Sequence, residues 1–538
     1  MSSHPLSTLG AARAGRLRGP GTGRLTVAIV AIAALTLGAC TTGGKSASAQ
    51  HSSGTLTIGI GVDLDTVDPA QQTTTTVQNV IDYGLQTLVT FDKDGNVQPM
   101  LATSWSTSSD GLALTLKLRT GVKFHDGTPL DADAVKFSLS RLIDPKIKVP
   151  IGAAFQVIKS IDVVDPSTVR LNLKYVDPNM LPNLGVTVAS ILSPASATKD
   201  GNSYTNIVHP VGTGPYTFVS FQKGSKATYE RYDGYWGDKP YYSKVVFDII
   251  PEANSREAGL RSGQLDMIMN PPVTDLKSLA AGGDITVLKA PSDRSIFIAF
   301  NNTKAPFTNA KVRQAFNYAV DKKAIIKSVL FDAVDQMDSP FAASIAGHCM
   351  TGDYSYNPDK AKQLLEESGV GKISVTMGSP TGRYLQDLQA SQAIAGYLRK
   401  VGVTVNVKTM DWPSYVSTMQ DQNGPFDLHL LGWAPGALDA PTQMEMFTKA
   451  SWAPKGLNNG FYSNPQVESM FAKASTDLDE ASRNAQYCQI QKTMWADAPW
   501  IFLWSQTLIL AYKSDIDGIS YQPNEKFETI NAHPSNEH

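Results

Sequence analysis

Strand patterns and helix patterns alternate along this chain, and that alternation restricts its fold more than any other feature. Period-two alternation and short apolar runs predict strands at residues 112–118, 373–377 and 403–408. Two further runs around Asp165-Pro166, at 161–164 and 169–173, predict a hairpin. Apolar residues on one face predict helices over 76–88, after Asp131, over 312–320, over 358–369 and after Asn464. The sequence therefore predicts a mixed α/β protein rather than an all-helical or all-β one.

Length and charge narrow the functional classes. At about 150 residues per domain, 538 residues correspond to about three domains or two large lobes. The net charge is −2 and the basic residues are scattered, so the concentrated basic face that nucleic acids need is missing. The chain holds 8 Trp, 19 Tyr and 19 Phe, which suits an apolar ligand surface and a large core equally well. We expect no nucleic-acid partner.

The N-terminal segment indicates export. Four arginines (Arg13, Arg16, Arg18 and Arg24) precede an apolar run at 25–37 that is too short for a comfortable membrane span. Leu37-Gly38-Ala39-Cys40 resembles the lipobox of bacterial lipoproteins, which implies a signal peptide over 1–39 and a lipid anchor on Cys40. The Gly-, Ser- and Thr-rich residues 40–54 predict a flexible tether. The alternative is an ordinary secretory signal with a chance cysteine.

Two more cysteines, Cys349 and Cys488, remain after Cys40. Outside the cytoplasm two such thiols can form a disulfide. Because they are far apart in the sequence, pairing depends on geometry that the sequence does not supply. A disulfide and two separate buried thiols stay equally open at this point.

Several short motifs occur in a fixed order. They include PMLATSW at 99–105, LKLR at 116–119, GVKFHDG at 121–127, HPVGTGPY at 209–216, YWG at 235–237, VRQA at 312–315, FYSNP at 461–465 and DAPW at 497–500. Together they resemble the signature of the family 5 extracytoplasmic solute-binding proteins, the dipeptide and oligopeptide receptors of ABC importers. The similarity runs over about residues 55–513. Each motif is weak alone, whereas their number and order make the resemblance strong.

The resemblance implies a two-lobed periplasmic-binding-protein (Venus-flytrap) fold of the α/β class, with an extra subdomain in the first lobe. The first lobe would comprise 55–90, 206–300 and 505–538, with the extra subdomain at 91–205. The second lobe would comprise 301–504. The ligand would lie between the lobes, and its contacts with both would favour a closed state.

No pattern of an enzyme is present in the sequence. The eight histidines form no His-x-x-x-His pair, there is no Cys-x-x-Cys pair, and there is no Gly-x-Ser-x-Gly motif. His125 lies beside Asp126, but inside a family motif at a strand end, where a structural turn explains it better. We therefore expect no catalysis, no metal and no cofactor.

The segment 426–439 is the first candidate for the ligand cleft. Alternating apolar residues predict a strand that ends at Gly432-Trp433, followed by a loop. Trp433 either lines a ligand cleft or caps the edge of the core. In peptide receptors of the family, an aspartate three residues after the matching tryptophan holds the peptide amine, and here that position is Gly436. Either Asp439 takes this role, or no free amine is bound.

Two other loops resemble cleft loops of the family. Arg383, in Gly382-Arg383-Tyr384, is the candidate anchor for a ligand carboxylate, and an exposed arginine is the alternative. Tyr384 is expected beside it. The acidic loop 63–68, which includes Asp65, is expected to contribute backbone contacts rather than salt bridges.

The sequence thus predicts a monomeric lipoprotein at the extracytoplasmic face of the cell membrane. It would capture a short peptide and deliver it to the permease and ATPase of an ABC importer. The family also includes receptors for oligosaccharides, metal complexes, glutathione and opines, and Gly436 favours a non-peptide solute. A ligand-sensing lipoprotein is the alternative from another class.

Overall fold

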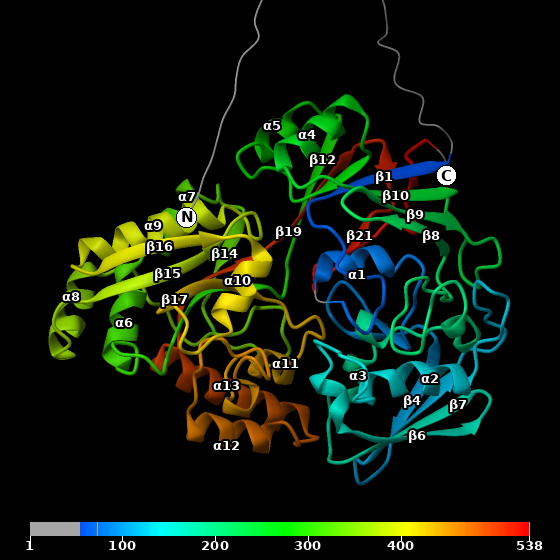
Figure 1. Cartoon of the computed structure of the whole chain (residues 1–538), viewed down its shortest axis with the longest axis horizontal. Coiled ribbons are helices and arrows are strands. Elements are labelled where there is room, and N and C mark those ends of the chain that lie inside the picture. The colour runs from blue at the N-terminus through cyan, green and yellow to red at the C-terminus, as the bar shows by residue number, and fades with distance from the viewer. Residues whose placement is uncertain (1–53, 73, 537–538) are drawn as a thin grey trace, which may run out of the picture. The chain divides into compact units, whose positions relative to one another are not determined.

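The computed structural model describes residues 54–72 and 74–536. Three large sheets, of seven, six and four strands, organise this part of the chain (Figure 1). The predicted signal peptide, the predicted anchor Cys40 and the predicted tether up to residue 53 lie outside the described residues. None of the helices within the described ranges has the length and apolar character needed to cross a membrane.

The seven-stranded sheet has the order β12-β19-β11-β1-β10-β9-β8. Its strands are β1 (Thr55–Ile60), β8 (Tyr216–Gln222), β9 (Lys226–Arg231), β10 (Lys244–Ile249), β11 (Met267–Met269), β12 (Ile285–Ala290) and β19 (Leu508–Lys513). β1 is parallel to both of its neighbours, β10 and β11, and the outer pairs are antiparallel. α4 (Ala253–Ser262) contacts β11 of this sheet and α5 (Leu276–Ala281) contacts β12, and α1 (Thr75–Ile81) follows β1 in the chain.

The four-stranded antiparallel sheet, β4-β5-β7-β6, lies within the predicted extra subdomain. Its strands are β4 (Ala102–Thr107), β5 (Ala113–Leu118), β6 (Ile158–Asp165) and β7 (Thr168–Leu173). The predicted hairpin at 161–173 is present as β6 and β7. α2 (Ala132–Ile143) packs on this sheet (Figure 1). Asp131 begins α2 because its carboxylate accepts a hydrogen bond from the Ala134 N–H at 2.9 Å.

The six-stranded sheet has the order β14-β18-β13-β17-β15-β16. Its strands are β13 (Ser295–Phe300), β14 (Val334–Gln336), β15 (Ser374–Pro380), β16 (Thr404–Met410), β17 (Leu428–Trp433) and β18 (Trp500–Gln506). The larger helices of this region are α6 (Ala310–Ala319), α7 (Lys322–Ser328), α8 (Pro358–Glu367), α9 (Asp387–Lys400), α10 (Trp412–Met419), α12 (Pro465–Ala474) and α13 (Glu480–Asp497).

Every residue of β13 is buried, because the six-stranded sheet has a core on each face. Ile296, Ile298 and Phe300 belong to one hydrophobic cluster, which includes residues of α6 and α9. Phe297 and Ala299 alternate with them and belong to a second cluster, which includes residues of α13. A strand that is buried on both faces reads as a continuous apolar run, as SIFIAF does here.

The remaining elements are short. They are the strands β2 (Val89–Phe91), β3 (Val97–Pro99), β20 (Ile516–Asp517), β21 (Ser520–Gln522), β22 (Lys526–Glu528) and β23 (His533–Pro534), and the helices α3 (Met180–Asn183) and α11 (Ala440–Met444). Short 3₁₀ turns are η1 (Ala153–Val157), η2 (Thr187–Ala189), η3 (Pro194–Thr198) and η4 (Lys449–Ser451).

The chain passes between the two larger sheets at two short links. After β12 it reaches β13 through residues 291–294, and between β18 and β19 the link is the single residue Thr507. Since 295–300 pair with β17 and β18, they belong to the second lobe. The predicted boundary at residue 300 is therefore about one strand too late, because the buried apolar pattern of β13 does not reveal its sheet. Residues 505 and 506 likewise belong to β18.

The helix predicted over 76–88 is shorter than expected. α1 ends at Ile81, and its last turn closes as the Gly84 N–H donates to the Ile81 carbonyl at 3.1 Å. The turn around Gly214 then approaches so closely that a Cβ on Gly214 would lie 2.7 Å from the backbone of Gly84. This tertiary contact requires glycine at position 214.

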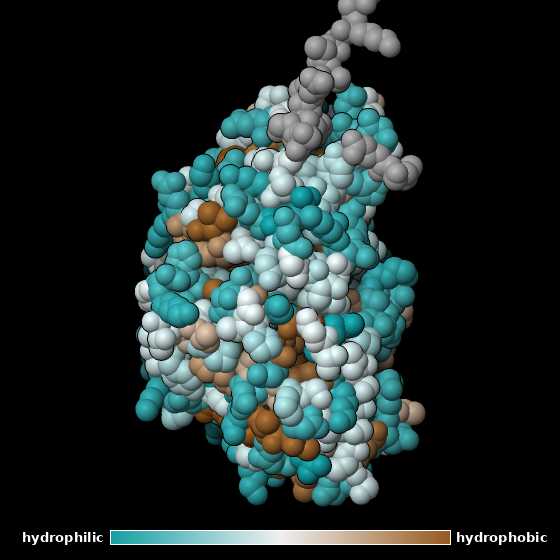
Figure 2. Space-filling model, turned by 90° about the vertical axis from the view of Figure 1, so that its right-hand side faces the viewer, coloured by the Kyte–Doolittle hydropathy of each residue, from teal (hydrophilic) through white to brown (hydrophobic). Residues whose placement is uncertain are grey.

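A disulfide between Cys349 and Cys488 joins the loop before α8 to α13, with the two Cα atoms 5.4 Å apart. The sequence had left this pairing open. The surface of the face shown in Figure 2 is mainly hydrophilic, with hydrophobic residues in small separated groups. Within the described ranges, the large apolar side chains exposed by more than half are Val164, Tyr175, Met350 and Leu478.

A cavity lined by both lobes

The candidate site is a cavity of about 1480 Å³, counting the part that opens to solvent. The first lobe contributes the start of α1 and apolar residues from two stretches, 150–155 and 183–188. The second lobe contributes the loop before α9, α10, the end of β17 and the loop around α11. A cavity lined mainly by apolar side chains with a few polar groups is typical of a small-molecule site.

β17 leads directly into the cavity, where Gly432 and Trp433 form part of the wall. A Cβ on Gly432 would lie 2.6 Å from the ring of Tyr384, so glycine is needed for that ring to pack there. The Tyr384 hydroxyl donates to the Gly432 carbonyl at 3.2 Å. Trp433 also packs against the second core cluster of the six-stranded sheet. Trp433 therefore lies between the cavity and the core, and its part in ligand binding stays a prediction.

Arg383 lies in the same cavity and has no counter-ion among the described residues. Its Cζ is 5.1 Å from the ring centroid of Tyr384 and 5.1 Å from that of Trp412. Within the described residues, no group accepts a hydrogen bond from its buried Nε. Burial lowers the pKa of Arg383 from its ordinary value, although the group stays cationic at neutral pH.

The loop that carries Arg383 is held by Asp387, at the first turn of α9. The Asp387 carboxylate accepts hydrogen bonds from the backbone N–H groups of Arg383 at 2.9 Å and of Tyr384 at 3.2 Å. It also accepts one from Gly382 at 3.2 Å. A buried carboxylate thus fixes the backbone, and the guanidinium remains available to the cavity.

A second arginine at the wall, Arg294, is already neutralised. Its guanidinium donates to both oxygens of Glu525, at distances between 2.5 and 3.0 Å. Ser292 donates to the same carboxylate at 3.2 Å. Arg294 is the last residue of the 291–294 link between the sheets, so this buried ion pair ties the link to the C-terminal segment. Sequence reasoning missed this pair because 231 positions separate its members.

Gly436 occupies the position where the family resemblance leads one to expect an acid. Its φ is +74°, its N–H donates to Asp293 at 2.7 Å, and its carbonyl accepts from Asn524 at 3.1 Å. Burial raises the pKa of Asp293 to about 7. Here the backbone, not a side chain, makes the contacts at this position.

Asp439, the predicted substitute acid, is buried and caps α11, because its carboxylate accepts a hydrogen bond from the Thr442 N–H at 2.9 Å. It is not among the residues found to line the cavity. Six residues further on, Glu445 does line it. Sequence reasoning missed Glu445. The only signal was weak: Glu445 is the single acid between residues 440 and 456.

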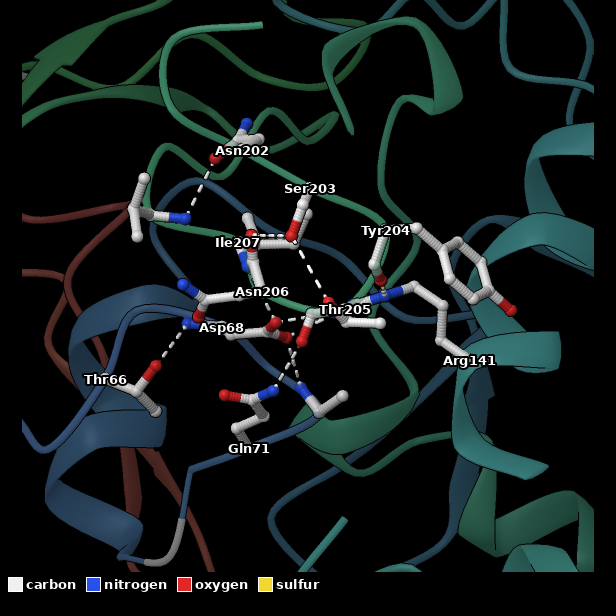
Figure 3. Close-up of polar contacts among 12 residues, drawn as sticks. Thr66, Asp68, Gln71, Arg141, Asn202, Ser203, Tyr204, Thr205, Asn206 and Ile207 are labelled. Carbon is white, nitrogen blue, oxygen red and sulfur yellow. Dashed lines mark hydrogen bonds and ion pairs between the residues drawn. The ribbon is translucent and has the colours of Figure 1, made fainter. Parts of the chain in front are cut away.

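The acidic loop 63–68 does not contribute to the cavity lining. Asp65 is exposed, and Asp63 accepts a hydrogen bond from the Gly224 N–H at 2.9 Å. Asp68 is fully buried and forms an ion pair with Arg141 of α2 at 2.5 Å (Figure 3). It also accepts from the Ile207 N–H at 2.9 Å. Asp68 therefore joins three chain segments.

Comparison with known proteins gives consistent results. The family model of bacterial extracellular solute-binding proteins, family 5 (middle), matches residues 96–455. A glutathione-binding protein of Pectobacterium atrosepticum is 32% identical over 480 residues, covering 88% of this chain and 93% of the relative.

Two solved structures are similar over most of both chains. The periplasmic binding protein DppA of Helicobacter pylori, in complex with the peptide STSA, has a TM-score of 0.79 at 27% identity, covering 88% of this chain and 98% of its own. The oligopeptide-binding protein AppA of Bacillus subtilis, in complex with a nonapeptide, has a TM-score of 0.77 at 25% identity. The match covers 88% of this chain and 98% of the AppA chain.

Proposed function

This chain belongs to family 5 of the bacterial extracellular solute-binding proteins, and we propose that it captures a short peptide for import by an ABC transporter. The peptide would bind in the cavity between the lobes and be delivered to a membrane permease. Related proteins that bind glutathione, the peptide STSA and a nonapeptide support a peptide ligand.

The observation that carries this proposal is the free guanidinium of Arg383. A partly buried arginine without a counter-ion is unfavourable, and a ligand carboxylate would supply the missing partner. A carboxylate matches the planar fork of a guanidinium, with two parallel hydrogen bonds. The rings of Tyr384 and Trp412 restrict the guanidinium before binding, because each lies 5.1 Å from its centre. We therefore keep the prediction from the sequence that Arg383 binds a carboxylate of the ligand.

The remainder of the cavity suits the side chains of a peptide. Ile151 on the first-lobe side and Trp433 on the second-lobe side are partly exposed apolar residues of the lining, and the buried Phe155, Val188 and Met446 also belong to it. Because the lining residues come from both lobes, a ligand that contacts both would stabilise the closed arrangement. The two short links between the sheets are suited to act as the hinge.

The test of this proposal is native mass spectrometry of the purified protein, before and after exposure to a tryptic digest of mixed proteins. A retained mass that fragments as a peptide supports the proposal. A retained sugar, metal chelate or opine would replace the peptide by another solute while leaving the transport role intact. If transport of the retained compound into cells persisted after deletion of this protein, its role would instead be that of a sensor.

We further propose that Cys40 carries the lipid that holds the protein at the extracytoplasmic face of the membrane. Small residues, Gly38 and Ala39, directly precede it, and a Gly- and Ser-rich stretch follows. Labelling of cells with an alkyne-bearing palmitate should mark the wild-type protein and spare Cys40→Ser. We expect the detergent-solubilised protein to be a monomer by light scattering.

A further inference from the structure

One residue of the cavity wall, Gly436, is held at both of its backbone polar groups. It belongs to residues 434–437, the cavity loop, all of which line the cavity. The Gly436 N–H donates to Asp293 Oδ2 at 2.7 Å, and its carbonyl accepts from Asn524 Nδ2 at 3.1 Å. Asp293 belongs to the 291–294 link between the sheets, and Asn524 lies at the tip of the β21–β22 hairpin. The cavity loop is therefore clamped from two separate segments of the chain.

The hairpin that carries Asn524 is fixed on α1. The side chain of Asn79 donates to the Glu525 carbonyl at 2.9 Å and accepts from the Phe527 N–H at 3.0 Å. Both strands of the hairpin are short, so these contacts at its tip hold it in place. A movement of the cavity loop away from α1 therefore breaks the hydrogen bond between Asn524 and Gly436.

The clamp contains two buried oxygen atoms that lack a donor. Within the described residues, no group donates a hydrogen bond to Asp293 Oδ1 or to Asn524 Oδ1. The two side chains are only 0% and 2% exposed. A flip of the Asn524 amide does not help, because the Gly436 carbonyl can only accept and needs Nδ2 opposite it. Buried acceptors without a donor are unfavourable, and a proton on Asp293 would turn its Oδ1 into the donor that Asn524 Oδ1 lacks.

The surroundings of Asp293 favour that proton. Burial, followed by the negative charge of Glu525, raises the pKa of Asp293 to about 7. The Gly436 N–H and the positive charge of Arg294 act in the opposite direction and do not outweigh them. The cavity loop has no ionisable side chain. Asp293 therefore changes its protonation near neutral pH, at the junction of the link and the cavity.

We propose that Asp293 and Asn524 form a proton-dependent clamp on the cavity loop. In the protonated state Asp293 Oδ1–H donates to Asn524 Oδ1, and the two residues hold Gly436 between them. As the pH rises, the proton passes to solvent, the hydrogen bond between the two side chains is lost, and the Asp293 carboxylate repels that of Glu525. The cavity loop then opens more readily and a ligand is released. The release of a ligand rests on the proposed function, whereas the clamp itself does not.

Hydrogen exchange of the full-length protein without added ligand tests the clamp, because the Gly436 N–H reports directly on it. Exchange of the cavity loop is measured by mass spectrometry at about pH 6 and about pH 8.5, and each rate is corrected for the intrinsic pH dependence of amide exchange. When the loop is open, Asp293 is hydrated and regains its ordinary pKa of 3.8. Linkage then predicts that the protection of the loop falls about tenfold between the two pH values.

Asp293→Asn separates this proton from every other titrating group. Its amide donates permanently to Asn524 Oδ1 while its carbonyl accepts from the Gly436 N–H, so the protection of the loop should change by less than about twofold. Asp427→Asn is the matched control. The Asp427 carboxylate also accepts from a backbone N–H, that of Thr376 at 2.8 Å, but it is partly exposed and lies outside the clamp. This control should keep the tenfold change of wild type.

Two results would overturn the clamp. Corrected protection that is equal at both pH values in wild type would show that no proton is linked to the loop. A folded Asp293→Asn protein that keeps the tenfold change would show that the proton belongs to another group, such as Glu445. The first comparison uses wild type alone, so it does not depend on the stability of any variant.

The release of a ligand is tested with the tryptic digest at the same two pH values. Wild type should retain fewer peptides in native mass spectrometry at about pH 8.5 than at about pH 6, and Asp293→Asn should retain equal amounts. Equal retention by wild type would contradict the coupling of the clamp to the ligand. Retention of no peptide at either pH would contradict the proposed function, while the exchange measurement still decides whether the clamp exists.

Discussion

The guanidinium of Arg383 lies over the indole ring of Trp412, with its Cζ 5.1 Å from the ring centroid. Trp412 belongs to α10, and Arg383 to the loop before α9, so two separate segments meet at the cavity wall. An aromatic face supports a cation without neutralising it, because the attraction involves the ring quadrupole and leaves the hydrogen-bond donors free. This arrangement holds a positive charge in a buried place without using up its capacity to bind an anion.

Replacement of Trp412 by alanine should therefore weaken peptide binding. The contact contributes about 0.5–2 kcal/mol, so affinity should fall by about 2- to 30-fold. Isothermal titration with a peptide retained in the mass-spectrometric screen measures this change. Trp236→Ala is the control, since Trp236 lies 4.2 Å from Arg119 and outside this cavity. Equal losses in the two variants would argue against a specific role of Trp412.

The buried pair of Asp68 and Arg141 should matter for stability and not for binding. Arg141→Ala leaves the Asp68 carboxylate buried without its cation, and this typically costs about 3–5 kcal/mol. Urea denaturation at neutral pH measures the loss. Asp233→Asn is the control: Asp233 is exposed and pairs with Lys239 at 2.6 Å, so solvent screens the pair and its removal should change the stability little. A similar small loss for both variants would show that Asp68 is not held as Figure 3 depicts.

The structure also predicts how pH affects the unliganded protein. The pKa of Glu445 is raised from 4.5 to about 7 in the folded state, mainly by burial. The folded protein therefore binds a proton at Glu445 more strongly than the unfolded chain does. Its contribution to stability is complete below about pH 4.5 and is lost as the pH rises through about 7.

Because glutamine does not titrate, Glu445→Gln lacks this dependence. The free energy of unfolding of wild type, taken relative to Glu445→Gln, should fall between pH 5 and pH 8. Denaturant titrations of both proteins at these two pH values provide the difference. A difference that stays constant or rises with pH would mean that the Glu445 carboxylate is well hydrated or paired.

Gly436 provides a test of the loop conformation. Its φ of +74° is accessible to glycine at little cost, whereas alanine pays about 1–2 kcal/mol there. Gly436→Ala should lower the free energy of unfolding by about this amount, and Gly436→Asn should lower it less, since asparagine adopts this conformation more readily. Thermal unfolding of the two variants would show the order, and equal stability of all three proteins would contradict this backbone assignment.

Local patterns in the sequence predicted some of the helices and strands, among them α2, α8 and the hairpin of β6 and β7. Caps such as Asp131 and Asn357 mark true helix starts, because one side chain satisfies the backbone N–H groups of the next turn. The same logic applies to Asp439, which precedes Ala440-Pro441, a helix-start pattern that favours a cap over a ligand contact. The placement of β13 in the second sheet was not predictable, since an apolar strand does not specify its neighbours.

The candidate site was predicted in part. Trp433, Gly432, Arg383 and Tyr384 all line one cavity, although their roles in binding stay predictions. Asp65 lies elsewhere, and Glu445 was overlooked because nothing local distinguishes it from a solvated glutamate. Its significance arises from tertiary structure: the loop around α11 brings it to the cavity that residues of 150–188 also line, and no ion pair with it is found among the described residues.

The central claim is that Arg383 binds the carboxylate of a peptide. The most direct measurement is isothermal titration of one retained peptide and of the same peptide with a C-terminal amide, against wild type and Arg383→Gln. Wild type should bind the free acid at least about tenfold more tightly than the amide, and Arg383→Gln should bind the two equally. Equal affinity of wild type for the acid and the amide would contradict the claim.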